Sequence, residues 1–418
     1  MDYIILSIPI FFILIGVELL IAKLRKTHLY RFNDAVANIS CGIAQQITVA
    51  LAKTALIVGY IYLYRHFRLF EIPDTWWTWF LLFIGVDFFY YWFHRLSHEI
   101  NVLWGAHIVH HQSEEYNLSV ALRQSSFQGF ISMIFYLPLA LIGFNPVAFV
   151  TVNAFQTLYQ FWIHTKLISK LHPVLEFIFN TPSHHRVHHG RNPKYIDRNH
   201  GGTLIIFDRL FGTFQKEEEE VVYGVTKPLA SWNPVWANFD YYADLWATLK
   251  QPLTLGERLK LVWASPGWMP TRLGGFQRPK DVKPGAEIYN TTIPSTLNYY
   301  ILAQFTVVLL ITTLFLFGID KYAIHARIIL CAWILLSVMS LGGLFELRKW
   351  AFYLEIGRLL SFVVLVVAFR HQWWGGITLP GLAIAVFSLA WFLFFRKLFN
   401  YRIEGKSDVG KTENADCQ

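Results

Sequence analysis

The sequence predicts an all-α fold, a polytopic membrane bundle of about nine helical spans. Composition is the first observation: 54% of the 418 residues are hydrophobic and only 15% are charged, whereas soluble domains carry about 25% charged residues. A series of long apolar segments is the second. The third is a concentration of histidines, because twelve of the sixteen lie between His94 and His200. These features place the chain in the integral membrane class.

The predicted spans are the segments that approach the 20 or so apolar residues needed to cross a bilayer as a helix. They cover residues 2–22, 37–64, 76–93, 127–143, 146–163, 294–317, 326–346, 351–369 and 378–396. The first segment has no basic region before its apolar stretch, unlike a signal peptide. We therefore expect it to be retained as a membrane span.

The basic residues predict an orientation for these spans. Lys23, Arg25, Lys26 and Arg31 follow the first span, and such clusters favour the cytoplasmic side. The N-terminus is then non-cytoplasmic, and every dense histidine cluster falls on the cytoplasmic face. The formal charge of +8 is explained by loops of this kind, and no aromatic-basic surface indicates nucleic-acid binding.

We expect five regions along the chain. They are N-terminal spans (1–75), a histidine-rich core (76–215), a cytoplasmic segment (216–293), a second membrane block (294–400) and a flexible tail (401–418). The three cysteines indicate neither a disulfide framework nor a cysteine metal site.

Three histidine clusters carry the functional argument. Residues spaced i, i+3 and i+4 share one face of a helix, so each cluster can direct two or three imidazoles to one point. The clusters are His94 and His98; His107, His110 and His111; and His185, His188 and His189. His164, at the end of the fifth span, is a further candidate ligand, and His184 is included because it adjoins the third cluster.

So many imidazoles predict two metal ions, because four ligands satisfy a single zinc. Imidazole suits zinc, copper, iron and nickel alike. The predicted place of the clusters, at the ends of membrane helices, favours iron: oxidising a hydrocarbon within a bilayer requires redox chemistry that zinc lacks. The roles of His172 and His200 stay open at this point.

Acidic and amide side chains near the clusters are candidates for orienting the imidazoles. Metal-bound histidines usually donate their second N–H to a carboxylate or carbonyl. Asp87 lies two helical turns before His94, and Glu99 directly follows His98. Both are assigned a supporting catalytic role. Asn153, Gln156 and Gln160 form a polar stripe that leads to His164 and either lines the metal site or joins helices.

The pattern of these clusters resembles the fatty acid hydroxylase/sterol desaturase superfamily. HxxxH at 94–98, HxxHH at 107–111 and HxxHH at 185–189 occur in the order that this superfamily uses. The surrounding sequences are similar to the alkylglycerol monooxygenase branch, especially at 116–119, 121–125, 180–192 and 207–214. Two positions depart from it: we would expect an aromatic such as tyrosine at His200 and glycine at His172.

The resemblance implies a di-iron site, O₂ as co-substrate and a lipid substrate. In the alkylglycerol monooxygenase branch, hydroxylation occurs beside an ether oxygen, and the product collapses to an aldehyde and glycerol. The resemblance further implies an external electron donor, tetrahydrobiopterin in this branch and ferredoxin- or cytochrome-type donors in others.

Two alternatives remain at the sequence level. A desaturase would use the same di-metal site, and only product mass would distinguish it from a hydroxylase. A metal transporter would need ligands spread along a path through the membrane instead of clusters at one face.

Overall fold

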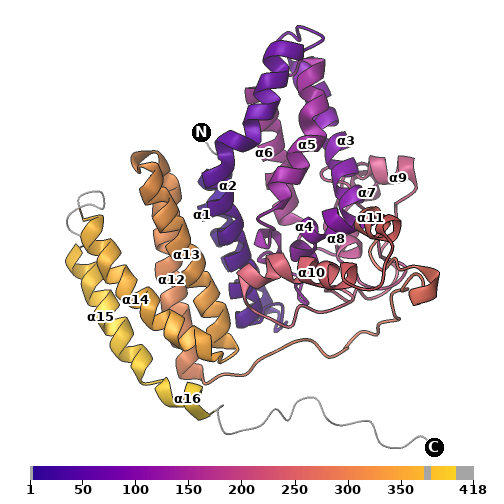
Figure 1. The fold of residues 1–418 in the computed structure, drawn as a ribbon. Coiled ribbons are helices and arrows are strands. Elements are labelled where there is room, and N and C mark those ends of the chain that lie inside the picture. The colour runs from indigo at the N-terminus through magenta and orange to yellow at the C-terminus, as the bar shows by residue number, and fades with distance from the viewer. Residues whose placement is uncertain (1–2, 371–377, 402–418) are drawn as a thin grey trace, which may run out of the picture. The chain divides into compact units, whose positions relative to one another are not determined.

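The computed structural model describes residues 3–370 and 378–401. The chain divides into two compact units, Met1–Asn290 and Thr291–Gln418, and Figure 1 shows their helical architecture. Within the described ranges the regular structure is helical, with two isolated β-bridges, Phe179–Leu204 and Gly190–Tyr223. The predicted all-α fold is therefore confirmed.

The first unit combines long apolar helices with shorter helices, some of which carry histidine clusters. The long helices are α1 (Tyr3–Leu24), α2 (Phe32–Phe67), α3 (Trp76–Glu99), α5 (Gln128–Ile142) and α6 (Pro146–Trp162). The shorter ones are α4 (Asn101–His111), η1 (Val120–Leu122), α7 (Pro173–Ile178), α8 (Pro182–His188), α9 (Ile206–Phe211), α10 (Pro234–Leu249), α11 (Leu255–Trp263) and η2 (Thr271–Leu273).

Local sequence explains where the helices that position the histidines begin. Thr75 and Thr78 form a reciprocal capping box at the start of α3, which satisfies two otherwise unpaired backbone N–H groups. Asn145 caps α6, and Pro146 occupies its first position, where a missing N–H costs nothing. Only Ile100 separates α3 from α4, so the first two histidine clusters lie on consecutive helices.

Apolar packing holds the long helices of the first unit together. Tyr60 on α2, Leu82 and Val86 on α3, and Leu139 on α5 belong to one buried cluster. A Cβ on Gly85 would lie 2.9 Å from the Leu139 side chain, so this glycine permits the close approach of α3 and α5. This packing holds α3, whose last turns carry His94 and His98.

The second unit is a smaller helical block. It contains α12 (Ser295–Phe317), η3 (Ile319–Lys321), α13 (Ile324–Phe345), α14 (Lys349–Ala368), α15 (Thr378–Leu393) and α16 (Arg396–Tyr401). A network of buried polar side chains links α12, α13, α14 and α15.

Each predicted span corresponds to a helix, but not every helix has the length and apolarity of a span. Five segments do: Tyr3–Leu24, Phe32–Ala52, Ser295–Phe317, Ile324–Phe345 and Lys349–Ala368. The protein is thus an integral membrane protein with at least these membrane-capable helices among its described residues. His371 and the predicted tail beyond Tyr401 lie outside the described residues.

Candidate metal centre

Nine buried histidines form two groups, each with its ligand-capable nitrogens within 4.8 Å of one another. Group one consists of His94, His98, His107, His111 and His188. Group two consists of His110, His164, His185 and His189. Both groups draw on α4 and on the α8 segment, and the ring centroids of His111 and His189, one from each group, are 4.4 Å apart.

Helical periodicity explains how the groups form. His94 and His98 lie on the last turns of α3, and His107 and His111 lie one turn apart on α4. His110 lies between these two on the helix and therefore points to group two. The i, i+3, i+4 spacing that predicted one shared face per cluster thus divides the second and third clusters between two adjacent groups.

Backbone carbonyls fix which nitrogen of several imidazoles is free. Nδ1 of His164 lies 2.7 Å from the Gln160 carbonyl oxygen. Nδ1 of His110 lies 2.9 Å from the Arg123 carbonyl oxygen, nearer than the Gln124 amide nitrogen at 3.3 Å. A carbonyl only accepts, so each Nδ1 carries the hydrogen and each Nε2 carries a lone pair.

These lone pairs face each other. In group two, Nε2 of His110 and Nε2 of His164 are 3.2 Å apart. In group one, His94 donates from Nδ1 to the His200 carbonyl, and His107 donates from Nδ1 to the amide oxygen of Gln128. The Nε2 atoms of His94 and His107, which therefore both carry lone pairs, are 3.0 Å apart. Two lone pairs at this distance repel unless a cation or a proton lies between them, so the arrangement suits a metal ion.

At neutral pH, protons do not lie between these facing nitrogens, because the imidazoles are not protonated to the charged form. Burial lowers the pKa of His110 to about 4 and that of His188 to about 3, since a buried site disfavours the charged form. Burial also lowers the pKa of His107, His164 and His189 well below the usual value. The imidazoles are therefore neutral, the state in which histidine binds metals.

Several buried ring nitrogens have no hydrogen-bond partner in the described structure. They include Nε2 of His98, Nε2 of His188 and Nδ1 of His185. Buried polar atoms are normally satisfied, and exceptions require an explanation such as an ion. The donor set is therefore suited to borderline divalent ions such as iron or zinc, and two adjacent groups suit a pair.

His200 lies beside group one, although it is not part of the group. Its side chain is fully buried, both ring nitrogens lack partners, and its ring centroid is 5.1 Å from that of His98. Its backbone carbonyl accepts the hydrogen of His94 Nδ1. The backbone of His200 therefore orients the ring of His94, a contact that the sequence did not predict.

The structure does not bring His184 to either group, in contrast to the sequence expectation. Its Nδ1 lies 3.3 Å from Thr181 Oγ1, and its ring packs against Phe214. His184 precedes the i, i+3, i+4 set of α8 by one residue, and this step turns its side chain away from the groups. His172 is the N-cap of α7, which it caps through its own ring.

Asp87 also differs from its expected role. Its carboxylate accepts hydrogen bonds from the Gln156 amide and from the backbone N–H groups of Thr203 and Leu204, and no described imidazole contacts it. Asp87 therefore holds the 203–204 segment, which follows His200, and does not itself touch a histidine of either group. The polar stripe contributes through Gln156, which donates to Asp87, and through the Gln160 carbonyl.

Glu99 does not contact a histidine in the described structure either. Its carboxylate pairs with Arg95 one turn earlier on α3, at 2.9 Å, with 35% of its side chain exposed. A residue adjacent to His98 in sequence points about 100° away from it on a helix, which explains the difference.

Sequence reasoning missed the groups that do support the imidazoles. Asp208 accepts from the backbone N–H groups of His200 and Gly201 and from the Thr213 hydroxyl, which fixes the carbonyl that orients His94. Asp197 lies 3.6 Å from His98 Nδ1. Asp208 falls in the 207–214 sequence noted above, which was a usable signal. The backbone carbonyls that accept from the imidazoles could not be predicted, because every residue has a carbonyl and the sequence does not show which one faces a histidine.

The nine histidines of the two groups fall within a stretch of the chain that matches a known family. Residues 79–213 match the fatty acid hydroxylase family. The chain is 40% identical over 368 residues to an alkylglycerol monooxygenase of Xenopus tropicalis (87% of this chain, 82% of the relative). It is 41% identical to one of Danio rerio (85% and 80%) and 39% identical to one of Homo sapiens (87% and 82%). No solved structure matches the chain.

The fold and the histidine centre define a membrane enzyme of the fatty acid hydroxylase class, an oxygenase acting on lipids. Within that class, the chain belongs to the alkylglycerol monooxygenase family. The resemblance inferred from the histidine spacing is therefore confirmed.

Proposed function

We propose that the two histidine groups hold a pair of iron ions and that the enzyme uses O₂ to hydroxylate an ether lipid beside its ether oxygen. The observation that carries this proposal is the facing lone pairs of His110 and His164, and of His94 and His107. When bound, an iron pair would supply the redox chemistry needed to activate O₂ for C–H oxidation.

The residues of the chain have distinct tasks in this scheme. Group one would hold one ion and group two the other. The carbonyls of Gln160, Arg123 and His200 keep Nδ1 protonated and direct Nε2 inward. Such outer contacts fix the tautomer and raise ligand basicity. Asp87 and Asp208 hold the 200–204 segment in place.

The overall reaction balances without a further oxidant. A C–H bond and O₂, with two electrons and two protons, give an alcohol and water. The hydroxyl beside the ether oxygen makes a hemiacetal, which collapses to an aldehyde and glycerol. The family name of the relatives supports an alkylglycerol substrate. The electrons come from an external donor of the tetrahydrobiopterin type, in preference to the ferredoxin- and cytochrome-type donors of related branches.

We further propose that the metal centre faces the cytoplasm, with the N-terminus on the opposite side. Arg31 belongs to the basic stretch after α1, and its Nε lies 2.6 Å from Glu115, four residues after His111. The basic stretch and the second histidine cluster therefore lie at the same end of the first unit. Such stretches favour the cytoplasmic side.

Isotope labelling tests the proposed chemistry. Purified enzyme in lipid nanodiscs receives an alkylglycerol, tetrahydrobiopterin and ¹⁸O₂, and the aldehyde is reduced at once to an alcohol so that water cannot exchange its oxygen. We expect one ¹⁸O in the trapped product and about two irons per chain. Loss of two hydrogens without label would instead indicate a desaturase, and metal flux in vesicles without product would indicate a transporter.

A further inference from the structure

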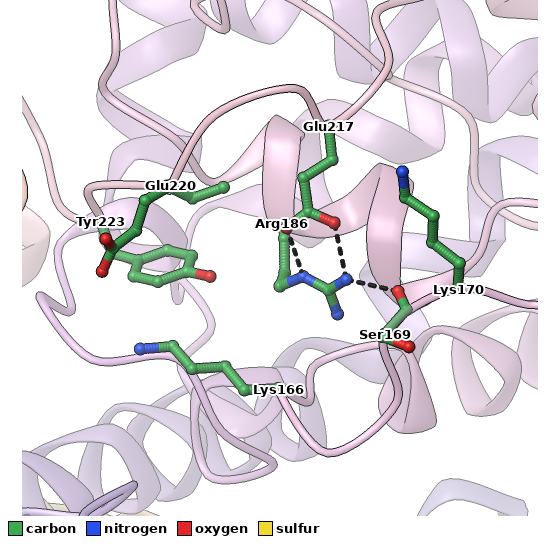
Figure 2. A pocket seen from close by; sticks show the side chains of 8 residues that line it. Lys166, Ser169, Lys170, Arg186, Glu217, Glu220 and Tyr223 are labelled. Atoms are coloured by element: carbon green, nitrogen blue, oxygen red, sulfur yellow. Dashed lines mark hydrogen bonds and ion pairs between the residues drawn. The ribbon is translucent and has the colours of Figure 1, made fainter.

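A cavity lined mainly by charged side chains adjoins α8, the helix that carries His185 of group two. Its volume is about 430 Å³, and it is lined by Lys166, Ser169, Lys170, Arg186, Glu217, Glu220, Val221 and Tyr223. Figure 2 shows Arg186 at its centre, between Glu217 and Ser169, with Lys166 extending toward Tyr223. The size falls in the range of small-molecule sites. The charged lining does not suit the apolar chain of a lipid.

Arg186 makes the inner wall of this cavity rigid. It lies on α8 between His185 and His188 and is 6% exposed. Its guanidinium makes a bidentate contact with Glu217, at 2.7 Å for each bond, and donates to the backbone carbonyls of Thr165 and Ile168. Because all of these bonds are internal, Lys166, Lys170 and Glu220 provide the charges that a ligand would meet.

Two stacked tyrosines connect the cavity to the metal centre. Tyr223 lines the cavity and stacks on Tyr116, with ring centroids 4.8 Å apart and planes inclined by 13°. Tyr116 is completely buried, and its ring lies 5.3 Å from that of His189 and 5.8 Å from that of His164. Its hydroxyl donates to the Ile163 carbonyl, which fixes the ring beside His164.

We propose that this cavity binds the electron donor, a small reduced nitrogen heterocycle of the pterin type, and that electrons reach group two through Tyr223 and Tyr116. The proposal rests on the proposed function. The carbonyl of such a ring accepts from Lys166 or Lys170, and its N–H edge donates to the carboxylate of Glu220. Each transfer removes one electron and one proton from the donor, and two transfers supply what one hydroxylation consumes.

The two tyrosine rings provide a path of closely packed atoms for the electrons, and neither tyrosine is changed by the overall reaction. Electron transfer is fastest across atoms in van der Waals contact, and the two rings replace what would otherwise be a gap between cavity and histidines. Tyr223 therefore needs its ring but not its hydroxyl. This separates Tyr223→Phe, which keeps the path, from Tyr223→Leu, which removes it.

Binding is tested first, on the full-length metal-free protein, by anaerobic calorimetric titration with tetrahydrobiopterin. Removing one charged hydrogen bond costs about 1.5–3 kcal/mol, so Lys166→Gln and Glu220→Gln should each raise Kd roughly tenfold or more. Lys227→Gln is the matched control, because this exposed lysine pairs with Asp244 and does not line the cavity. Unchanged affinity in both cavity variants would overturn the proposal, whatever the fate of the tyrosine variants.

Reduction is tested second, on iron-loaded enzyme in an anaerobic stopped-flow experiment. Tyr223→Leu should slow reduction by tetrahydrobiopterin at least about tenfold yet leave reduction by dithionite unchanged, whereas Tyr223→Phe should resemble the wild type. Equal slowing with both reductants would contradict the tyrosine path. Enzyme reduced beforehand with dithionite and then given O₂ and lipid should form product in every variant; failure of the wild type there would refute the proposed function instead.

Discussion

The two units each bury a polar cluster, and the clusters differ in one respect. In the second unit, the side chains of Glu355 and Arg358 are at most 1% exposed and form a network with Tyr300, Gln304 and Ser340. No buried side-chain nitrogen or oxygen in the described part of that unit lacks a partner. In the first unit, the histidine centre leaves ring nitrogens unpartnered and lone pairs in opposition.

This difference separates a structural role from a functional one. Burying a polar group without a partner is costly, so a satisfied network is explained by the fold alone. In the histidine centre, three of the nine members have a buried ring nitrogen without a partner, and these are donors that a metal ion could take. Ionisable residues in a membrane protein suggest function by default, but in the second unit the completed hydrogen bonds remove the need for that interpretation.

The largest predicted effect breaks the histidine cluster. His110→Ala should abolish turnover and lower the metal content of group two, because His110 contributes one of only four nitrogens to that group. The protein should still insert into membranes. His66→Ala, an exposed histidine on α2, is the control and should retain full activity. Labelled product from His110→Ala at the wild-type rate would refute the role of group two.

Breaking the fully hydrogen-bonded network around Glu355 and Arg358 should lower the stability of the protein without changing its turnover. Glu355→Gln removes one charge of a buried pair, which typically costs about 3–5 kcal/mol. Thermal unfolding in detergent should show this loss, while the folded fraction retains normal turnover per iron. A large fall in turnover with unchanged stability would assign the network to function and erase the contrast between the two units.

An intermediate effect is expected from the residues that orient the imidazoles. Asp208→Asn weakens the bonds that hold the His200 carbonyl against His94, and loss of such outer contacts lowers metal affinity or activity about 10–100-fold. Competition with a chelator measures the affinity. Asp244→Asn, on an exposed ion pair, should leave it unchanged.

The smallest effect is predicted for the side chain of His200. His200→Phe keeps an aromatic ring and removes two buried nitrogens without partners. We expect the metal-free protein to gain about 1 kcal/mol of stability, because an unsatisfied buried group is costly. The five members of group one should bind metal as before. Loss of one metal per chain in this variant would make His200 a ligand.

The sequence predicted the helices and the nine clustering histidines because both are encoded in local periodicity. Apolar length marks the helices, and i, i+3, i+4 spacing brings His107 and His111 to one side of α4. It did not predict the division into two groups, because the spacing within α4 turns His110 away from His107 and His111 but does not show that His164, His185 and His189 meet it there. The expectation that Asp87 contacts an imidazole was wrong because two of its three partners are backbone N–H groups more than 110 residues away in sequence, which no side-chain pattern reveals.

The most direct test of the central claim is a crystal structure of the iron-loaded enzyme with anomalous scattering measured at the iron edge. The account predicts two anomalous peaks per chain, one within each histidine group, at roughly the 3.5–4 Å separation of two-metal sites. A map with peaks elsewhere, or with His110 and His164 hydrogen-bonded to water where the metal should lie, would contradict it.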